Sequence, residues 1–471
     1  MWCYIHNEDV DNYLKQYFPG FKDEDRDIFK IYQNNTITFL PKFFLYNYPS
    51  NKLIEYYGKN NLDSEKINVK CNVKLRPLQK KAVEVVLNQY RKDQSFNGIL
   101  KLYPGAGKTV LSIYILAQFG LKTCIIVDTE DLKRQWIKEI IQFTDLTEND
   151  IGIIHRNIFL TNKPICITLV QTLLSKLKNN FDQSFKLIDS ARFGTVIYDE
   201  VHSVSSSEKY AKASLFFRSK NIIGLSATPF ANGVAEVLMK NTVGDIKYET
   251  KDYKLIPKYY MIYYYSNVDS DTTGKVVKSG KNKGNDVTVL TAINRCPELF
   301  MKKAIYTKYI LEKKNYQILI TKYTKALLNI NHVVMIICNT KKQVIKISEV
   351  LEENGIENRR YYGDEQEIEK DTDNVLVVTY KFCGKGFNMP RISALIYASS
   401  FSGKTSMIQT IGRILRDYKD KKQPVVIDLI DKSCNQLFAS EIPRKIKILE
   451  NEFDGCEIVH VDQEEIKNAT K

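Results

Sequence analysis

The residues best suited to chemistry form a short glycine-rich segment, Tyr103 to Thr109, with the sequence YPGAGKT. An apolar run precedes it and the helical pattern Val110 to Phe119 follows. A phosphate-binding loop requires this context, because glycines let backbone amides approach phosphates and a helix N-terminus adds positive partial charge. In such a loop the lysine reaches the β and γ phosphates and the threonine binds magnesium. The predicted nucleotide-binding residues are therefore Pro104, Gly105, Ala106, Gly107, Lys108 and Thr109.

A second segment, Thr195 to His202, places two carboxylates at the end of another apolar run. Asp199 is suited to hold Mg²⁺, and Glu200 is suited to orient or deprotonate an attacking water. By itself, an apolar run that ends in Asp-Glu is a weak indication of a nucleotide-hydrolysing site. Downstream of a phosphate-binding loop it is a strong indication. His202 reads either as a surface loop residue or as a residue that couples the nucleotide to strand movement, and its place in the motif favours coupling.

Two series of short apolar runs alternate with longer amphipathic segments, which predicts two α/β units with parallel sheets. Open α/β sheets bind ligands at the carboxyl ends of their strands, where both motifs above fall. The predicted strands are 99–103, 123–128, 165–170, 195–199 and 222–226 in the first unit, and 333–338, 374–379, 394–398 and 425–429 in the second.

Composition and charge bound the class of protein. The formal net charge of +14 attracts polyanions, and nucleic acid is the commonest such partner, although a merely lysine-rich composition would give the same value. No apolar run approaches the roughly 18 residues that span a bilayer, and the first residues lack a secretory pattern. Nine scattered cysteines form no CxxC pair. We expect an intracellular, non-secreted protein of the cytoplasm, the nucleus, or a viral or plasmid replication compartment.

The segment Ser266 to Thr291 has few large apolar residues and is predicted to be an extended loop or insertion. Its basic run is either a solvated loop, the favoured interpretation, or an arm that contacts a nucleic-acid strand. The tyrosines that precede it, from Tyr259 to Tyr265, either stack on bases or form a buried linking strand, and their alternation with Met261 and Ile262 favours the strand. The basic run consists of Lys275, Lys278, Lys281 and Lys283.

Taken in order, the motifs resemble those of superfamily 2 helicases of the DExH type, the group that includes XPB, phage recombination helicases and helicases of large DNA viruses. Leu102 stands where the full phosphate-loop pattern has its first glycine, and the family commonly has this shortened form. The resemblance covers about residues 75 to 435. Besides the two segments above, it rests on LRPLQ (75–79), Leu132 with Gln135 and Trp136, the Thr-Leu-Val-Gln-Thr-Leu run (168–173), SATP (226–229), CGKGFNMP (383–390) and QTIGRILR (409–416).

The resemblance implies two tandem RecA-like domains that use ATP and Mg²⁺. The family uses Gln79 near the adenine, and Ser226 and Thr228 to link the ATP state to the strand groove. Arg413 and Arg416 are candidate arginine fingers, which as a pair three residues apart on a helix would lie on nearly the same face. The remaining residues implied are Gln409 for coupling, and Gly386 and Asn388 for the nucleotide, where Asn388 replaces the usual aspartate.

We expect an ATP-dependent helicase or translocase that moves along nucleic acid, with DNA favoured over RNA. The alternatives are an ATP-switched clamp or remodeller without processive unwinding, and a non-catalytic nucleic-acid binding protein; the sequence leaves protein partners open. The expected parts are an accessory domain (1–74), a first RecA-like domain (75–250), a linker with the basic insertion (251–291), a second RecA-like domain (292–460) and a tail (461–471).

Overall fold

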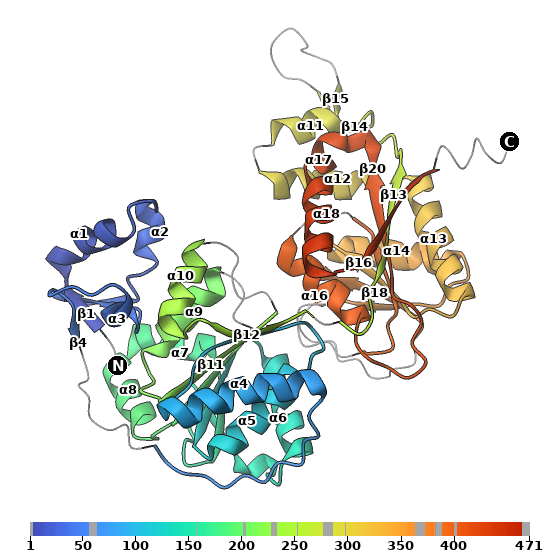
Figure 1. Cartoon of the computed structure of the whole chain (residues 1–471). Helices are drawn as coiled ribbons and strands as arrows, with labels where there is room; N and C mark the ends of the chain where they lie inside the picture. The colour runs from blue at the N-terminus through green and yellow to red at the C-terminus, as the bar shows by residue number, and fades with distance from the viewer. Residues whose placement is uncertain are drawn as a thin grey trace. The chain divides into compact units, whose positions relative to one another are not determined.

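The computed structural model divides into two compact units, Met1–Thr250 and Lys251–Lys471 (Figure 1). Each unit is described by itself below. No helix in the described part of the chain is long and apolar enough to cross a membrane. The structure describes residues 3–55, 64–156, 158–200, 204–227, 233–251, 253–276, 286–296, 298–362, 373–380, 382, 389–399 and 403–463.

A small antiparallel sheet with the strand order β2-β3-β1-β4 begins the first unit. Buried aromatic rings form its core, with the Phe18 ring 4.8 Å from the Phe29 ring and 5.6 Å from the Phe44 ring. The Asn47 side-chain amide donates to the Asn241 side-chain oxygen at 2.9 Å, so this part is fastened to the larger domain of its unit. Its elements are β1 (Cys3–His6), α1 (Asn7–Tyr17), α2 (Asp23–Asp27), β2 (Tyr32–Gln33), β3 (Ile37–Leu40), α3 (Phe44–Asn47) and β4 (Ile54–Glu55).

The main sheet of the first unit has the strand order β12-β5-β11-β10-β6-β9-β7-β8. Its strands are parallel to their neighbours except β8, which runs antiparallel to β7. The central strands β6, β10 and β11 are buried along their whole length, which explains why they read as continuous apolar runs. The strands are β5 (Asn97–Leu102), β6 (Thr123–Val127), β7 (Ile151–His155), β8 (Ile158–Phe159), β9 (Ile165–Leu169), β10 (Thr195–Asp199), β11 (Asn221–Ser226) and β12 (Ile246–Thr250).

Helices cover both faces of this sheet, with α4, α5 and α6 on one face and α7, α9 and α10 on the other (Figure 1). The first group lies next to the chain segments that carry the phosphate-binding loop. The helices are α4 (Pro77–Asp93), α5 (Lys108–Phe119), α6 (Glu130–Phe143), α7 (Val170–Asn179), α8 (Phe181–Asp189), α9 (Val204–Ser214) and α10 (Gly233–Thr242), with a 3₁₀ turn at Glu148–Asp150.

The second unit contains a seven-stranded parallel sheet with the order β17-β18-β16-β19-β20-β13-β21. The predicted fold class, two tandem α/β domains with parallel sheets, is confirmed. The strands are β13 (Lys258–Tyr264), β16 (Val334–Cys338), β17 (Arg359–Tyr361), β18 (Val375–Thr379), β19 (Ala394–Tyr397), β20 (Val425–Asp431) and β21 (Glu457–Asp462).

Two groups of helices cover this second sheet, with α13 and α14 on one face and α16 and α18 on the other (Figure 1). The helices are α11 (Val289–Arg295), α12 (Leu299–Ile310), α13 (Lys314–Asn329), α14 (Lys341–Glu353), α16 (Lys404–Ile414), α17 (Asn435–Phe438) and α18 (Glu441–Glu452), with a 3₁₀ turn at Lys432–Cys434.

Strand β13 lies inside the range 251–291 that the sequence suggested as a linker. It is hydrogen-bonded to β20 on one side and to β21 on the other, so the second sheet begins well before residue 292. Tyr259 and Tyr264 are buried, which agrees with a buried strand, whereas Tyr265, just after the strand, is 41% exposed. The linker proper is therefore shorter than the sequence suggested, because the tyrosine-rich run adds a strand to the sheet.

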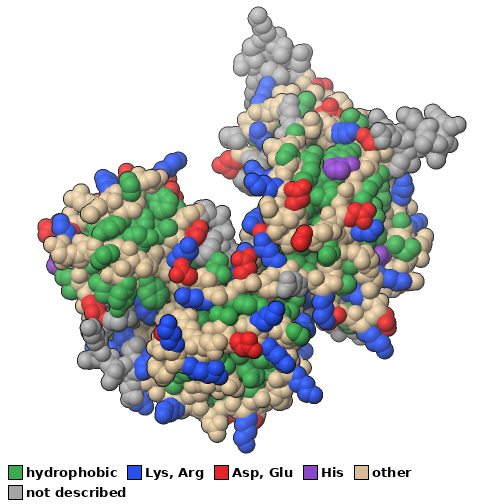
Figure 2. All heavy atoms as spheres, in the orientation of Figure 1, with side chains coloured by type: hydrophobic (Ala, Val, Ile, Leu, Met, Phe, Trp, Pro, Cys, Tyr) green, Lys and Arg blue, Asp and Glu red, His purple; other side chains and the backbone are tan. Residues whose placement is uncertain are grey.

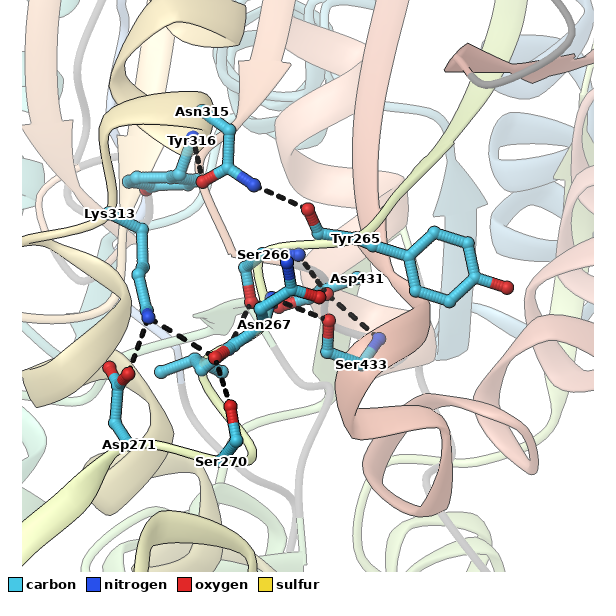
Figure 3. A network of polar contacts seen from close by, with 11 residues as sticks. Tyr265, Ser266, Asn267, Ser270, Asp271, Lys313, Asn315, Tyr316, Asp431 and Ser433 are labelled. Carbon is cyan, nitrogen blue, oxygen red and sulfur yellow. Dashed lines mark hydrogen bonds and ion pairs between the residues drawn. The ribbon is translucent and has the colours of Figure 1, made fainter.

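The insertion that follows β13 is anchored by the buried carboxylate of Asp431 at the end of β20 (Figure 3). Asp431 accepts hydrogen bonds from the backbone amides of Ser266 (3.1 Å) and Ser433 (3.0 Å), from the Ser266 hydroxyl, and from the Tyr306 hydroxyl (3.1 Å). Nearby, the Lys313 ammonium donates to the Asn267 carbonyl at 3.1 Å. These contacts fix the start of the insertion to the sheet.

The described parts of the insertion form a hairpin rather than an extended loop. Strands β14 (Thr272–Val276) and β15 (Asp286–Thr288) pair antiparallel, and Lys275 lies on β14. Lys278, Lys281 and Lys283 lie outside the described residues. On the face drawn in Figure 2, Lys and Arg side chains are spread over both units with Asp and Glu among them.

Candidate nucleotide site and arginine motif

The glycine-rich segment joins the end of β5 to the first residue of α5, Lys108. Gly105 and Gly107 adopt positive φ values of 90° and 80°, which residues with a side chain rarely adopt. A Cβ added to Gly107 would also lie 2.5 Å from the Gln79 side-chain nitrogen. Both glycines are thus required by the shape of the loop, and the loop leads directly into a helix N-terminus, the local geometry that binds phosphate.

Gln79 is hydrogen-bonded to the backbone of this loop. Its side-chain amide donates to the carbonyl oxygens of Ala106 (3.0 Å) and Gly107 (3.3 Å), and its side-chain oxygen accepts from the Arg76 backbone amide at 2.8 Å. The residue is 2% exposed. Gln79 therefore ties the first turn of α4 to the phosphate loop, and its contact with adenine stays a prediction.

Asp199 and Glu200 stand at the carboxyl end of β10, in the middle of the sheet. The Asp199 side chain accepts a 2.8 Å hydrogen bond from the indole of Trp136 on α6, and the Asp199 carbonyl accepts one from the Tyr210 hydroxyl. Burial raises the pKa of Asp199 to about 6; the Glu200 charge acts in the same direction, and the Lys108 charge opposes both. Such a carboxylate gains by binding a cation.

The phosphate loop and the acidic segment meet through Lys108 and Glu200. The Lys108 ammonium lies 3.0 Å from a carboxylate oxygen of Glu200, although β11 separates β5 from β10 in the sheet. Glu200 has a φ of 59°, an unusual value for a residue with a side chain. The strained backbone directly after β10 accompanies a side chain that faces the phosphate loop, so the two predicted motifs form one site.

The arginine motif lies on α16 of the second unit, and its geometry corrects one expectation. Gln409 and Arg413 are helical, and Arg413 is 8% exposed. The helix ends at Ile414, so Arg416 lies in the turn that follows. The two arginines therefore do not share one helix face, because the chain leaves the helix before it reaches Arg416.

The other predicted site residues divide into described and undescribed ones. Thr109 occupies the first turn of α5, and Ser226 is the fully buried last residue of β11, one strand from β10. The predictions for His202, Thr228, Gly386 and Asn388 lie outside the described residues.

Trp136 was found in the sequence only as part of a family motif, and its contact with Asp199 was not predicted. Its signal is faint, because a tryptophan on an amphipathic helix is expected to pack against the sheet whatever its indole nitrogen does. The partner of that nitrogen becomes visible only when α6 and β10 are placed in space.

Comparison with known protein families agrees with this geometry. Residues 72–231 match the family described as "Type III restriction enzyme, res subunit", and residues 310–418 match "Helicase conserved C-terminal domain". The first match contains the phosphate loop and the acidic segment, and the second contains α16 and Arg416. The chain is therefore a superfamily 2 helicase, an ATP-dependent enzyme that acts on nucleic acid.

Curated relatives come from viruses, archaea and bacteria. A putative ATP-dependent RNA helicase of Acanthamoeba polyphaga mimivirus is 25% identical over 80% of this chain and 70% of the relative. A DNA 3'-5' translocase, XPB2, of Sulfurisphaera tokodaii is 24% identical over 77% of this chain and 83% of the relative. A putative DNA 3'-5' helicase, Rad25, of Haloarcula marismortui is 32% identical, but over only 35% of this chain and 24% of the relative.

Solved structures share the fold at low identity. S. cerevisiae Dbp5 bound to RNA and ADP BeF3 superposes with a TM-score of 0.54 and 16% identity, over 84% of this chain and 92% of the other. The ATP-dependent Type ISP restriction-modification enzyme LlaBIII bound to DNA gives a TM-score of 0.54 and 14% identity, over 83% of this chain and 32% of the other. These likenesses support the tandem arrangement of α/β domains and nothing finer.

Proposed function

We propose that the chain is a nucleic-acid-stimulated ATPase that moves along DNA, with the nucleotide site built from the phosphate loop and the Asp199–Glu200 pair. The observation that carries the proposal is the 3.0 Å contact between Lys108 and Glu200. It brings a phosphate-binding cation and a candidate base together at the carboxyl edge of one sheet, where α/β proteins bind ligands.

The residues present fit a magnesium nucleotide. Hydroxyl and carboxylate oxygens are the ligands that Mg²⁺ prefers, and the site offers them on Thr109 and Asp199. When bound, the metal neutralises charge on the phosphates. Trp136 orients the Asp199 carboxylate, Lys108 draws the terminal phosphates toward the α5 N-terminus, and Glu200 accepts the proton of the attacking water.

The second unit supplies arginine for the same reaction in this proposal. Phosphoryl transfer spreads negative charge over the γ-phosphate oxygens, and a guanidinium from another domain stabilises that charge. Arg413 is a buried residue of α16, whereas Arg416 is more exposed and lies past the helix end. We therefore assign the finger to Arg416 first and a supporting role to Arg413.

The preference for DNA is a proposal that the relatives support unevenly. The names of XPB2 and Rad25 specify DNA, whereas the mimivirus relative is named an RNA helicase. The test is ATP hydrolysis measured side by side with single-stranded DNA, duplex DNA, branched DNA and RNA. We expect at least one DNA to stimulate more than RNA does. Equal or stronger stimulation by RNA would overturn the preference, and no stimulation by any nucleic acid would overturn the motor.

A strand-displacement assay separates a processive helicase from an ATP-switched clamp or remodeller. Both hydrolyse ATP on nucleic acid, but only the helicase releases a labelled strand at a rate that depends on ATP. Lys108→Ala provides the matched negative control, and Lys92→Ala, an exposed lysine of α4, provides a control with the same change of charge. Displacement by Lys108→Ala at the wild-type rate would show that the phosphate loop does not drive it.

A further inference from the structure

Arg416 lies in the turn that follows α16, and the contacts of this turn decide its position. The helix ends at Ile414, so Arg416 stands outside it, whereas Arg413 belongs to its last turn. Within the turn, the Lys421 amide donates to the Tyr418 carbonyl at 3.3 Å. Whatever holds this turn also decides where the guanidinium of Arg416 can reach.

Lys421 makes two direct contacts that hold it. Its ammonium donates to the Arg416 carbonyl oxygen at 2.7 Å and to the Pro390 carbonyl oxygen at 2.7 Å. Pro390 is the last residue of the segment 383–390 that resembles a helicase motif. One side chain therefore joins the backbone of the arginine motif to the end of a second motif segment.

The Lys421 ammonium makes its two hydrogen bonds although burial disfavours its charged form. Burial lowers the pKa of Lys421 to about 8, and the Arg416 charge adds to this effect while Asp417 opposes it. Two carbonyl oxygens accept from the ammonium, and hydrogen bonds from charged donors are the stronger kind. The two hydrogen bonds therefore favour a structural role for Lys421, because a lysine that served only solubility would keep its ammonium in water.

The same turn is also fixed from its other side by the segment that leads into β13. Asp417 forms an ion pair with Lys254, and the Gln423 side-chain amide donates to the Ile256 carbonyl. The Lys258 amide then donates to the Pro424 carbonyl at 2.9 Å, where β13 begins. Asp417 and the segment 423–424 are thus held by contacts separate from Lys421, whereas Lys421 holds the Arg416 carbonyl.

We propose that Lys421 is a positioning residue that fixes the backbone of Arg416 against Pro390 and so sets where the arginine guanidinium stands during ATP hydrolysis. The inference rests on the proposed role of Arg416 as the arginine finger. Lys421 lies outside the residues of the arginine motif and touches no reacting atom in this scheme. Its effect is therefore expected on the rate of the chemical step rather than on nucleotide affinity.

The test combines kinetics with hydrogen exchange on the full chain. In Lys421→Met we expect kcat for nucleic-acid-stimulated ATP hydrolysis to fall between about 10-fold and 100-fold, because a misplacement of ~1 Å costs on the order of 10²-fold. KM for ATP should stay within about twofold, since binding rests on the first unit. Without nucleotide, amide exchange should rise in peptides that cover residues 415–421 and 389–392.

Matched variants separate positioning from general damage. Lys421→Arg keeps a cation and several donors and should recover most of kcat, whereas Lys419→Met, an exposed neighbour, should leave both kcat and exchange at wild-type values. If Lys421→Met melts at a lower temperature than wild type, a second variant is needed. Lys421→Gln, which keeps donors on a shorter side chain, must then also lower kcat while leaving KM for ATP unchanged. Unchanged kcat and unchanged exchange would overturn the inference. Failure of the proposed function would instead appear as wild-type protein that does not hydrolyse ATP.

Discussion

The two units hold their predicted catalytic residues in different ways. In the first, Lys108, Asp199 and Glu200 lie at the carboxyl edge of one sheet and are already in contact with one another or with Trp136. In the second, Arg413 is a buried residue of α16 and Arg416 lies beyond the end of this helix, in a turn held by Lys421. The nucleotide half is built at the N-terminus of α5 and the carboxyl end of β10, whereas the arginine half depends on a turn.

This difference separates binding from the chemical step. A phosphate loop at a helix N-terminus binds a nucleotide without help from another domain. A guanidinium contributes when charge spreads in the transition state, so it can act through kcat alone. Changes in the first unit can therefore disturb nucleotide or metal binding, chemistry, or both, depending on the residue, whereas changes in the second should disturb chemistry alone. The predictions below test that division.

The largest effect is expected from Lys108→Ala. It removes the cation that contacts the phosphates and leaves Glu200 without its 3.0 Å partner, so ATP hydrolysis should fall to background while the fold is kept. Steady-state ATPase assays and a far-UV circular dichroism spectrum measure the two outcomes. Turnover at the wild-type rate in a folded variant would remove the phosphate loop from the site.

Arg416→Ala should come next, with ATP binding retained and hydrolysis reduced on the order of 10³-fold or more. Nucleic acid should no longer stimulate the remaining activity. Arg416→Lys should rescue little, because an ammonium cannot reproduce the planar guanidinium that engages two phosphate oxygens. Fluorescent-nucleotide binding and single-turnover hydrolysis separate the two effects. Weakened binding with a normal chemical step would reverse the proposed division between the units.

The parts of this comparison that the sequence predicted follow its strongest local signals. Buried parallel strands such as β6 and β10 are continuous apolar runs, and the loop glycines lie at fixed spacing from Lys108. The pattern missed β12 and β21, because these strands are partly exposed and alternate with charged or polar residues. It predicted a buried strand at β13 but assigned that strand to a linker, whereas β13 lies between β20 and β21 in the second sheet.

Contacts between segments that are far apart along the chain could not be predicted from the sequence. The bond from Trp136 to Asp199 joins α6 to β10, and the bond from Lys421 to Pro390 joins two turns. The end of α16 at Ile414 was also missed, since the next residues carry no glycine or proline to mark a stop. Such details depend on packing between elements, which local patterns do not encode.

Glu200→Gln separates ATP binding from water activation within the first unit. The variant keeps Asp199 for the metal and the size of the side chain, but it loses the base, so hydrolysis should fall by roughly 10²-fold while ATP binding persists. The bound nucleotide should be recovered as ATP rather than ADP after gel filtration. Recovery of ADP at the wild-type rate would show that another residue activates the water.

The smallest effect is expected from Trp136→Phe, which keeps an aromatic ring in the buried site and removes one hydrogen bond. The indole now donates to Asp199 at 2.8 Å, so its loss should leave the carboxylate less well oriented for Mg²⁺. We expect half-maximal ATPase activity to require roughly tenfold more Mg²⁺, with little change in kcat at saturating metal, since loss of a group that orients a metal ligand typically costs 10- to 100-fold in affinity. Tyr198→Phe is the matched control, because Tyr198 is the buried aromatic residue that precedes Asp199 on β10, and successive side chains of a strand point to opposite faces of the sheet. The measurement is a titration of ATPase rate against Mg²⁺ for wild type and both variants. If Trp136→Phe needed no more Mg²⁺ than Tyr198→Phe, the Trp136 indole would only fill space next to Asp199. The first unit would then orient this carboxylate without the indole hydrogen bond.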